Sequence, residues 1–370
     1  NKKKFQNFTN HKRDGILILP RYDHKNSRSQ VQVIDLNNFE VIHTYQHNIS
    51  EMNNEIKNLE EFHRHNIDNS TVRFEYRHPL ILNDGSLISH TEYSPLFKID
   101  LCSNLIWINE EEAFHHSLMI DHERNIWVPS IMYPYSRYVA EKIKSQGFFD
   151  DAIVKINSKG EIIYKKSVIE ILIENKILDD NFMIDANLDP IHLNDIEPVF
   201  NNSKHWKKGD IFLSLRHKSA IIHFRPSTSE VINYITGPFS QQHDIDIISS
   251  NEISIFNNNN YFEYENHSEI LIYNFETKNF KKVFNDQLKK ENFKTYTEGL
   301  SHFFKDGALF VEEQNHGRIM IFDKNKIKEI EYINKDENED IGFISWSRII
   351  EDQTFIENFK SLISAKECSN

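Results

Sequence analysis

Three stretches of the sequence decide the fold because they read as copies of one another: His116-Ser-Leu-Met-Ile, His192-Leu-Asn-Asp-Ile and His243-Asp-Ile-Asp-Ile. After the first and the third stretch, a polar turn leads into a second short apolar segment. Short apolar segments separated by turns are typical of antiparallel β-hairpins. A histidine at one place in a repeated hairpin also implies that several imidazoles point at a common locus.

The hairpin belongs to a larger unit of four short strands that recurs six times along the 370 residues. Four-stranded units repeated around an axis leave few exposed sheet edges, as in β-propellers. We therefore predict an all-β fold, a six-bladed β-propeller of four-stranded antiparallel blades, in a single domain over residues 1–350. The alternative is an irregular β-sandwich or a pair of small barrels, which explains the recurrence less well. The predicted blades are 15–48, 73–109, 114–166, 190–235, 241–285 and 297–333, followed by a closing segment, 341–350, and a C-terminal helix or tail, 351–370.

Four stretches interrupt the strand pattern with helical periodicity, and we expect them to form short helices. The first three should lie at the periphery of the propeller, and the fourth should form the C-terminal helix. The stretches are Ile49–His65, Tyr133–Phe149, Val168–Leu178 and Thr354–Ile363.

Composition and charge exclude several classes of protein. A net charge of −13 argues against a nucleic-acid sleeve and against adsorption to an anionic membrane. No run of about 18 apolar residues is present, so we expect no membrane span. The two cysteines, Cys102 and Cys368, lie far apart without metal-type spacing; a disulfide between them is not favoured, and neither is a zinc site. We predict no metal and no cofactor.

The histidines supply the candidate site. In a propeller the first strand of each blade lines the central channel, so His78, His116, His192 and His243 should gather near one mouth of that channel. Each of them alone could simply hydrogen-bond inside a polar channel, but the set favours a functional role. Catalytic partners must come within hydrogen-bond reach, so a spacing beyond about 10 Å would remove the basis of this interpretation.

Two further side chains extend the set. Asn194 lies two residues past His192 and should face the same side of an extended strand. Arg216 ends the next strand of that blade, where it should lie beside the channel or form a surface ion pair. A guanidinium, imidazoles and an amide together form a donor set suited to a tetrahedral oxyanion.

Taken together, these blocks resemble the arylsulfotransferase family, bacterial enzymes on a six-bladed propeller that work without an activated nucleotide sulfate. The resemblance spans Gly15 to Arg348. The enteric members carry a disulfide beside their nucleophilic histidine, whereas no cysteine lies near His243 in this sequence. The matching blocks are Phe114-His115-His116, His192-Leu193-Asn194, Ser214-Leu215-Arg216, Gly237-Pro238-Phe239-Ser240-Gln241-Gln242-His243-Asp244 and Trp346-Ser347-Arg348.

The resemblance implies ping-pong transfer of a sulfuryl group from an aryl sulfate donor to a phenolic acceptor. His243 matches the nucleophilic histidine and would carry the group as a sulfohistidine. The residues expected to bind the sulfuryl oxygens and assist proton transfer are His116, His192, Asn194 and Arg216. The residues expected as substrate-binding neighbours are His115, His78 and Asp244, although His78 matches no family motif.

One ring nitrogen of the nucleophile must stay unprotonated, so the other needs a fixed hydrogen-bond partner. Asp244 and Asp246 are the candidates for that partner in the sequence.

Two other functions fit the same sequence. A hydrolase or lyase could use the histidines, with or without a divalent metal, although Arg216 would repel a cation. A non-catalytic propeller could bind a glycan or protein partner through the loop Asn257–Asn260 and the adjoining Tyr261–Glu265. The arylsulfotransferase reading predicts small-molecule partners, an aryl sulfate and a phenol, with no nucleic acid and with a possible homo-oligomer. The sequence starts at Asn1 without Met, so an upstream segment is absent from it. A removed signal peptide or an anchor would account for that segment, and we expect a periplasmic, secreted or cell-envelope location.

Overall fold

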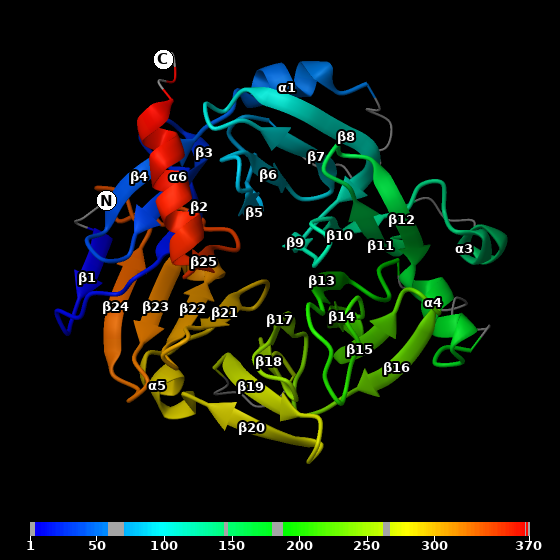
Figure 1. Cartoon of the computed structure of the whole chain (residues 1–370). Coiled ribbons are helices and arrows are strands. Elements are labelled where there is room, and N and C mark those ends of the chain that lie inside the picture. Colours follow the sequence, from blue (N-terminus) through cyan, green and yellow to red (C-terminus); the bar gives the residue numbers. More distant parts are fainter. Residues whose placement is uncertain are drawn as a thin grey trace.

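The computed structural model describes residues 4–57, 70–143, 147–179, 188–261, 267–366 and 368. Antiparallel sheets are arranged around a central axis as the blades of a propeller, with few helices (Figure 1). The prediction of an all-β propeller is therefore confirmed. Among the described residues, no helix has both the length and the apolar character needed to cross a membrane.

Three of the five hydrogen-bonded sheets have four strands, and in each of them consecutive strands are neighbours. The first consists of β25 (Arg348–Ile350), β2 (Ile16–Asp23), β3 (Arg28–Asp35) and β4 (Glu40–Tyr45). The second consists of β13 (Leu193–Pro198), β14 (Ile211–Leu215), β15 (Ala220–Arg225) and β16 (Glu230–Ile235). The third consists of β17 (His243–Ile247), β18 (Glu252–Asn257), β19 (Glu269–Asn274) and β20 (Asn279–Val283).

A fourth sheet has five strands because an N-terminal strand is added at its outer edge. It consists of β21 (Leu300–Phe303), β22 (Leu309–Glu313), β23 (Arg318–Phe322), β24 (Lys328–Ile333) and β1 (Phe5–Asn7). The fifth sheet has eight strands. They are β5 (Arg77–Ile81), β6 (Leu87–His90), β7 (Ser94–Ile99), β8 (Leu105–Phe114), β9 (Met119–Ile120), β10 (Ile126–Ile131), β11 (Asp151–Ile156) and β12 (Ile162–Ser167).

The prediction of six separate four-stranded blades is not confirmed. Four sheets are single blades, but the predicted blades 73–109 and 114–166 form one continuous sheet. The cause is the length of β8, which runs on for ten residues until Ala113 and Phe114 pair with Ile131 and Ser130 of β10. The strand expected to cover that part of β10 is β9, which has only two residues.

The core lies between neighbouring sheets rather than at the axis. Alternate side chains of β14 and β15, such as Phe212 and Ile221, pack against Ile253 and Leu271 of the next sheet, and all four are fully buried. Each such side chain contributes about 1.5–3 kcal/mol through burial. This two-sided packing explains why strands such as β14 and β15 are apolar at nearly every position.

The inner strands are stitched to one another by a repeated hydrogen bond. At each junction a polar side chain of one inner segment accepts an amide N–H from the next. The pairs are His78 Nδ1 with Leu118 N–H (3.1 Å), Ser117 Oγ with Ile196 N–H (3.0 Å), Asp195 Oδ2 with Ile245 N–H (2.7 Å) and Asp244 Oδ2 with Ser301 N–H (2.8 Å). The carboxylate of Glu312 then accepts the amides of Trp346 and Ser347 at 2.8 Å each, next to the strand that closes the ring. Because these amides have no strand partner on the axial side, the stitches satisfy buried donors that would otherwise cost free energy.

The chain closes the ring with its last strand, since β25 pairs with β2. Helices occur in the four stretches where helical periodicity was expected, although residues 58–65 of the first stretch lie outside the described part. They are α1 (Ile49–Glu55), α3 (Arg137–Lys142), α4 (Val168–Glu174) and α6 (Gln353–Ala365); α5 (Asn285–Lys290) was not expected.

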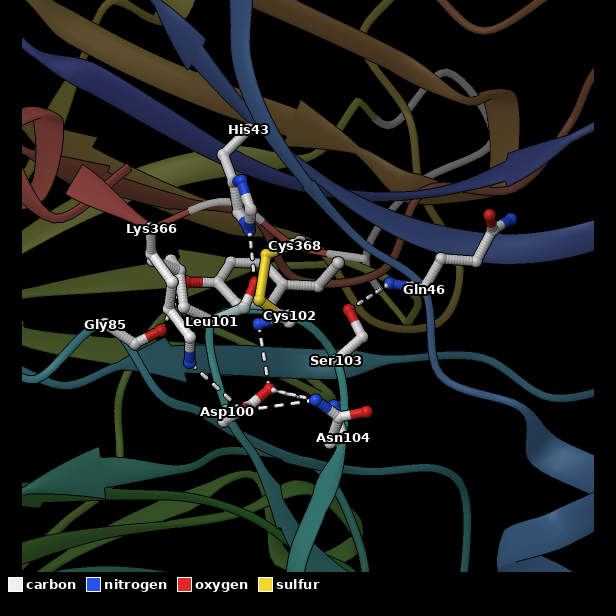
Figure 2. Close-up of a disulfide and its surroundings, with 11 residues drawn as sticks. His43, Gln46, Gly85, Asp100, Leu101, Cys102, Ser103, Asn104, Lys366 and Cys368 are labelled. Carbon is white, nitrogen blue, oxygen red and sulfur yellow. Dashed lines mark hydrogen bonds and ion pairs between the residues drawn. A yellow bond between two sulfur atoms is a disulfide. The ribbon is translucent and has the colours of Figure 1, made fainter. Parts of the chain in front are cut away.

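The expectation of unpaired cysteines is wrong, because Cys102 and Cys368 form a disulfide. Cys102 lies in the turn between β7 and β8, and α6 crosses the first sheet to bring Cys368 to it (Figures 1 and 2). The contact is reinforced by an ion pair between Lys366 and Asp100 at 3.1 Å. The apolar side of α6 buries Ile356 and Phe359 against the core. The two cysteines are 266 residues apart in the sequence, so no local sequence pattern could predict their pairing.

Candidate active site

Three of the predicted histidines meet at the axis. The ring centroid of His116 lies 5.0 Å from that of His192 and 6.2 Å from that of His243. These spacings fall well inside the predicted limit of about 10 Å. The backbone at His116 and His192 is left-handed, with φ of 58° and 54°. Such a conformation costs a non-glycine residue roughly 1–3 kcal/mol and is concentrated at functional sites.

Trp346 forms one wall of this cluster. Its indole is fully buried, with ring centroids 6.1 Å from both His116 and His243 and 5.4 Å from His78. His78 itself is committed to the stitch with Leu118, and burial, with help from Arg348, holds the pKa of His78 well below its usual value. His78 is therefore a buried neighbour of the cluster whose ring nitrogen already holds a backbone amide.

His243 is buried and neutral. Burial, and after it the guanidinium of Arg216, hold the pKa of His243 well below 6.5. Its Nδ1 lies 2.7 Å from Asn258 Oδ1, and its Nε2 accepts the backbone N–H of Glu298 at 3.2 Å. The sequence offered Asp244 and Asp246 as the hydrogen-bond partner of the His243 ring, but neither of them holds it. The site thus holds an uncharged imidazole fixed by polar groups, among them the backbone of Gln241 as well.

His116 is equally buried, and burial together with the neighbouring His115 lowers its pKa well below the usual value. The Nδ1 atoms of His115 and His116 lie 2.8 Å apart, so one of the two carries the shared proton. On its other side, His115 Nε2 lies 3.3 Å from Asp151 Oδ1. The doublet therefore links the cluster to a buried carboxylate, which is a route for moving a proton.

A second chain of contacts leads from His192 to Arg216. His192 Nδ1 lies 2.6 Å from Asp189 Oδ2, and its ring packs 4.5 Å from that of His217. Arg216 donates to His217 Nε2 at 2.8 Å and to Gln241 Oε1 at 3.3 Å. His217 Nδ1 in turn donates to the carbonyl oxygen of Asp189 at 2.7 Å. Arg216 is thus held inside the site rather than in a surface ion pair.

The side chains of Asn194 and Asp244 form hydrogen bonds with the backbone instead of with the histidines. Asn194 is fully buried and donates to the carbonyl oxygen of Gln242 at 2.8 Å. The carboxylate of Asp244 forms the stitch to Ser301 and lines a cavity of about 240 Å³ together with Arg348 and His302. The pairing register shifts at each of these two residues, so the simple alternation assumed from the sequence does not hold there.

Sequence reasoning missed several residues of the site. The signals were present but weak: His217 follows Arg216 directly, and Asn258 lies in an asparagine-rich loop that the sequence suggested for partner binding. The first part of that loop is turned inward, since Asn257 and Asn258 are fully buried and Asn259 is 8% exposed, whereas Tyr261 is 65% exposed. The adjoining residues 262–265 lie outside the described part of the chain.

A metal could be held only at one place in the described part of the chain. There, ligand atoms of Asp189, His192 and His217 lie within 4.8 Å of one another. This is not the trio of converging histidines considered from the sequence. The guanidinium of Arg216, 2.8 Å from His217 Nε2, opposes a cation at this place. The donor set is better suited to an anion with several oxygens.

Solved structures support the fold. A protein of unknown function from Bacteroides caccae superposes with a TM-score of 0.56 at 11% identity, covering 92% of this chain and all of the other. TolB from Acinetobacter baumannii gives 0.53 at 9% identity, covering 90% of this chain and 66% of TolB. At these identities the likeness concerns the fold alone.

Among curated proteins, none matches the sequence. The family model described as arylsulfotransferase (ASST) matches residues 78–335, which include every histidine of the cluster, the Arg216 segment and the Asn258 loop. The match covers more than half of the chain, and the chain therefore belongs to the arylsulfotransferase family.

Proposed function

We propose that this protein transfers a sulfuryl group from an aryl sulfate to a phenol in two steps, with His243 as the nucleophile. In the first step a lone pair of His243 forms a bond to sulfur, the bond from sulfur to the aryl oxygen breaks, and a phenoxide leaves. In the second step a phenolic oxygen attacks the sulfohistidine and restores the free imidazole. The observation that carries the proposal is the buried, neutral His243 inside a set of donors, because only an unprotonated imidazole is a nucleophile.

The roles of the neighbours follow from their chemistry. Arg216 supplies the fixed positive charge for the sulfuryl oxygens, and His192 is held beside it through Asp189 and His217. The His115–His116 pair, backed by Asp151, is placed to give a proton to the departing phenoxide and to take one from the acceptor. Asn194 positions the segment just before His243 through the carbonyl oxygen of Gln242.

Trapping of the covalent intermediate is the direct test. The protein is incubated with 4-nitrophenyl sulfate without an acceptor, and the initial burst of 4-nitrophenol is followed by absorbance. The mass of the peptide that contains His243 is then measured by mass spectrometry. We expect one equivalent of phenol and a sulfuryl adduct on that peptide, and neither in His243→Ala. A matched control is His302→Ala, a half-buried histidine on the cavity that holds Asp244. Absence of both burst and adduct over a panel of aryl sulfates would refute the proposal.

We propose that the eight-stranded sheet corresponds to two blades joined by β8, so that residues 1–350 form a single six-bladed domain. The Cys102–Cys368 disulfide supports an oxidising compartment, consistent with a periplasmic or secreted enzyme. We propose small aryl compounds as partners, and homo-oligomerisation remains a prediction.

A further inference from the structure

The two ring nitrogens of His243 face partners of different character. Nε2 receives the backbone N–H of Glu298 at 3.2 Å, and a backbone N–H can only donate. Nε2 must therefore carry the lone pair. The proton of the neutral ring is then on Nδ1, where Asn258 Oδ1 at 2.7 Å accepts it.

The orientation of the Asn258 amide leads to the same assignment independently. Its Nδ2 lies 3.0 Å from the carbonyl oxygen of Thr295 and 2.8 Å from that of Glu298. Both carbonyls can only accept, so the NH₂ group must face them, and the amide oxygen must face His243. Reversing the amide would place two acceptors against its oxygen and a donor against Nδ1–H.

The turn that carries Asn258 is fixed by a buried ammonium group. Lys294 Nζ donates to the carbonyl oxygens of Asn258 and Asn259 at 2.7 and 3.2 Å and to Asn260 Oδ1 at 3.3 Å. The Asn258 side chain is itself fully buried. Glu298, the other contact of the ring, is anchored through its carboxylate by Arg77. The side-chain partner of His243 is therefore fixed from outside the ring.

We propose that Asn258 is a positioning residue that keeps the proton of His243 on Nδ1 and so makes Nε2 the attacking nitrogen. The inference rests on the proposed function. When Nε2 bonds to sulfur and the aryl oxygen leaves with the bonding pair, the ring becomes an imidazolium. The hydrogen bond from Nδ1–H to Asn258 then becomes charge-assisted and stronger. Because sulfur bonds along the same lone pair, the Glu298 N–H must first move off Nε2, and it can then donate to a sulfuryl oxygen.

The ring itself can be examined without any reaction. Nitrogen-15 NMR of protein labelled at histidine, with His243 assigned by comparison with His243→Ala, distinguishes a protonated from an unprotonated ring nitrogen. We expect a single tautomer above pH 7, with Nδ1 protonated and Nε2 bare. A protonated Nε2, or rapid averaging between the two tautomers, would overturn the inference even if sulfuryl transfer occurs.

Substitution of Asn258 gives the kinetic test. Asn258→Leu keeps the volume but offers no acceptor, and we expect the burst rate constant to fall about 10²- to 10⁴-fold with little change in KM for the donor. Asn258→Asp restores an acceptor and adds a negative charge, so we expect partial rescue with an acid limb of the pH profile at higher pH.

The matched control is Asn233→Leu, which removes another hydrogen bond between an asparagine and a buried histidine, the 3.1 Å contact of Asn233 with His223. An unchanged burst rate in a folded Asn258→Leu protein would contradict the positioning role. If the wild-type protein forms no adduct but NMR finds the expected tautomer, the proposed function fails and the assignment of the proton stands.

Discussion

The disulfide between Cys102 and Cys368 should contribute strongly to the stability of the whole propeller. It closes a loop with a sequence separation of 266 residues, which includes most of the chain. In the chain-entropy model, closing such a loop removes about 19 cal/mol/K from the unfolded chain, or about 5.6 kcal/mol at 25 °C. With an unfolding entropy of about 2.1 cal/mol/K per residue, a chain of 370 residues should lose about 7 °C in Tm when both cysteines become serine.

Differential scanning calorimetry of Cys102→Ser/Cys368→Ser against the oxidised wild type measures this loss. Reduction of the wild type with dithiothreitol should lower its Tm to that of the variant, and should leave the Tm of the variant unchanged. The full loss in Tm is expected because α6 unfolds together with the propeller. A decrease in Tm of less than about 1 °C would refute this prediction, because it would mean that α6 detaches on its own before the blades unfold. The burst rate with an aryl sulfate should be the same in both proteins, since the disulfide lies in the β7–β8 turn and not at the histidine cluster.

Three further perturbations follow from the site and its walls. The acid limb of the burst rate should lie below pH 6.5, because burial first and Arg216 second lower the pKa of His243, so the ring stays neutral until the pH falls through that lowered value. In Arg216→Gln a stopped-flow pH profile should show a slower burst whose acid limb has moved upward, and an unmoved limb would contradict the assigned electrostatic contact. Trp346→Ala should lower the free energy of unfolding, measured with urea, by about 3–5 kcal/mol, because it leaves a cavity at a fully buried site beside three imidazoles. Trp346→Phe should lower it less, and equal losses would rule out cavity formation as the cause. Gly299→Ala should destabilise the protein by about 2–4 kcal/mol, because its φ is +100° and a Cβ would lie 2.6 Å from Phe256; an unchanged midpoint in the same assay would show that the turn beside Glu298 relaxes freely.

The sequence predicted the features that depend on local pattern. Short apolar segments separated by turns specify antiparallel strands, and their recurrence in units of four gave the propeller. The three histidine-led stretches also predicted a common locus, and there the ring of His116 lies 5.0 Å from that of His192 and 6.2 Å from that of His243. Arg216 was placed beside them because it ends the second strand of its blade.

Side-chain direction near the axis could not be predicted from alternation. Register shifts in β13 and β17 interrupt the two-residue period at Asn194 and Asp244. One extra residue turns the following side chains to the other face. Asp244 therefore bonds the Ser301 amide of the next blade instead of the neighbouring histidine.

Partners that lie far apart along the chain were beyond the sequence altogether. The number of separate sheets depended on how far β8 extends to reach β10, and the disulfide depended on where α6 ends. The repeated histidine hairpins by themselves determined the class of fold and the imidazoles that meet at its axis. Only the tertiary structure decided which nitrogen of His243 is bare, because the groups that fix its proton come from a turn 15 residues away and an amide 55 residues away. The pairing of β17 with β18 brings the turn to His243, and the segment that leads into β21 of the neighbouring blade supplies the amide.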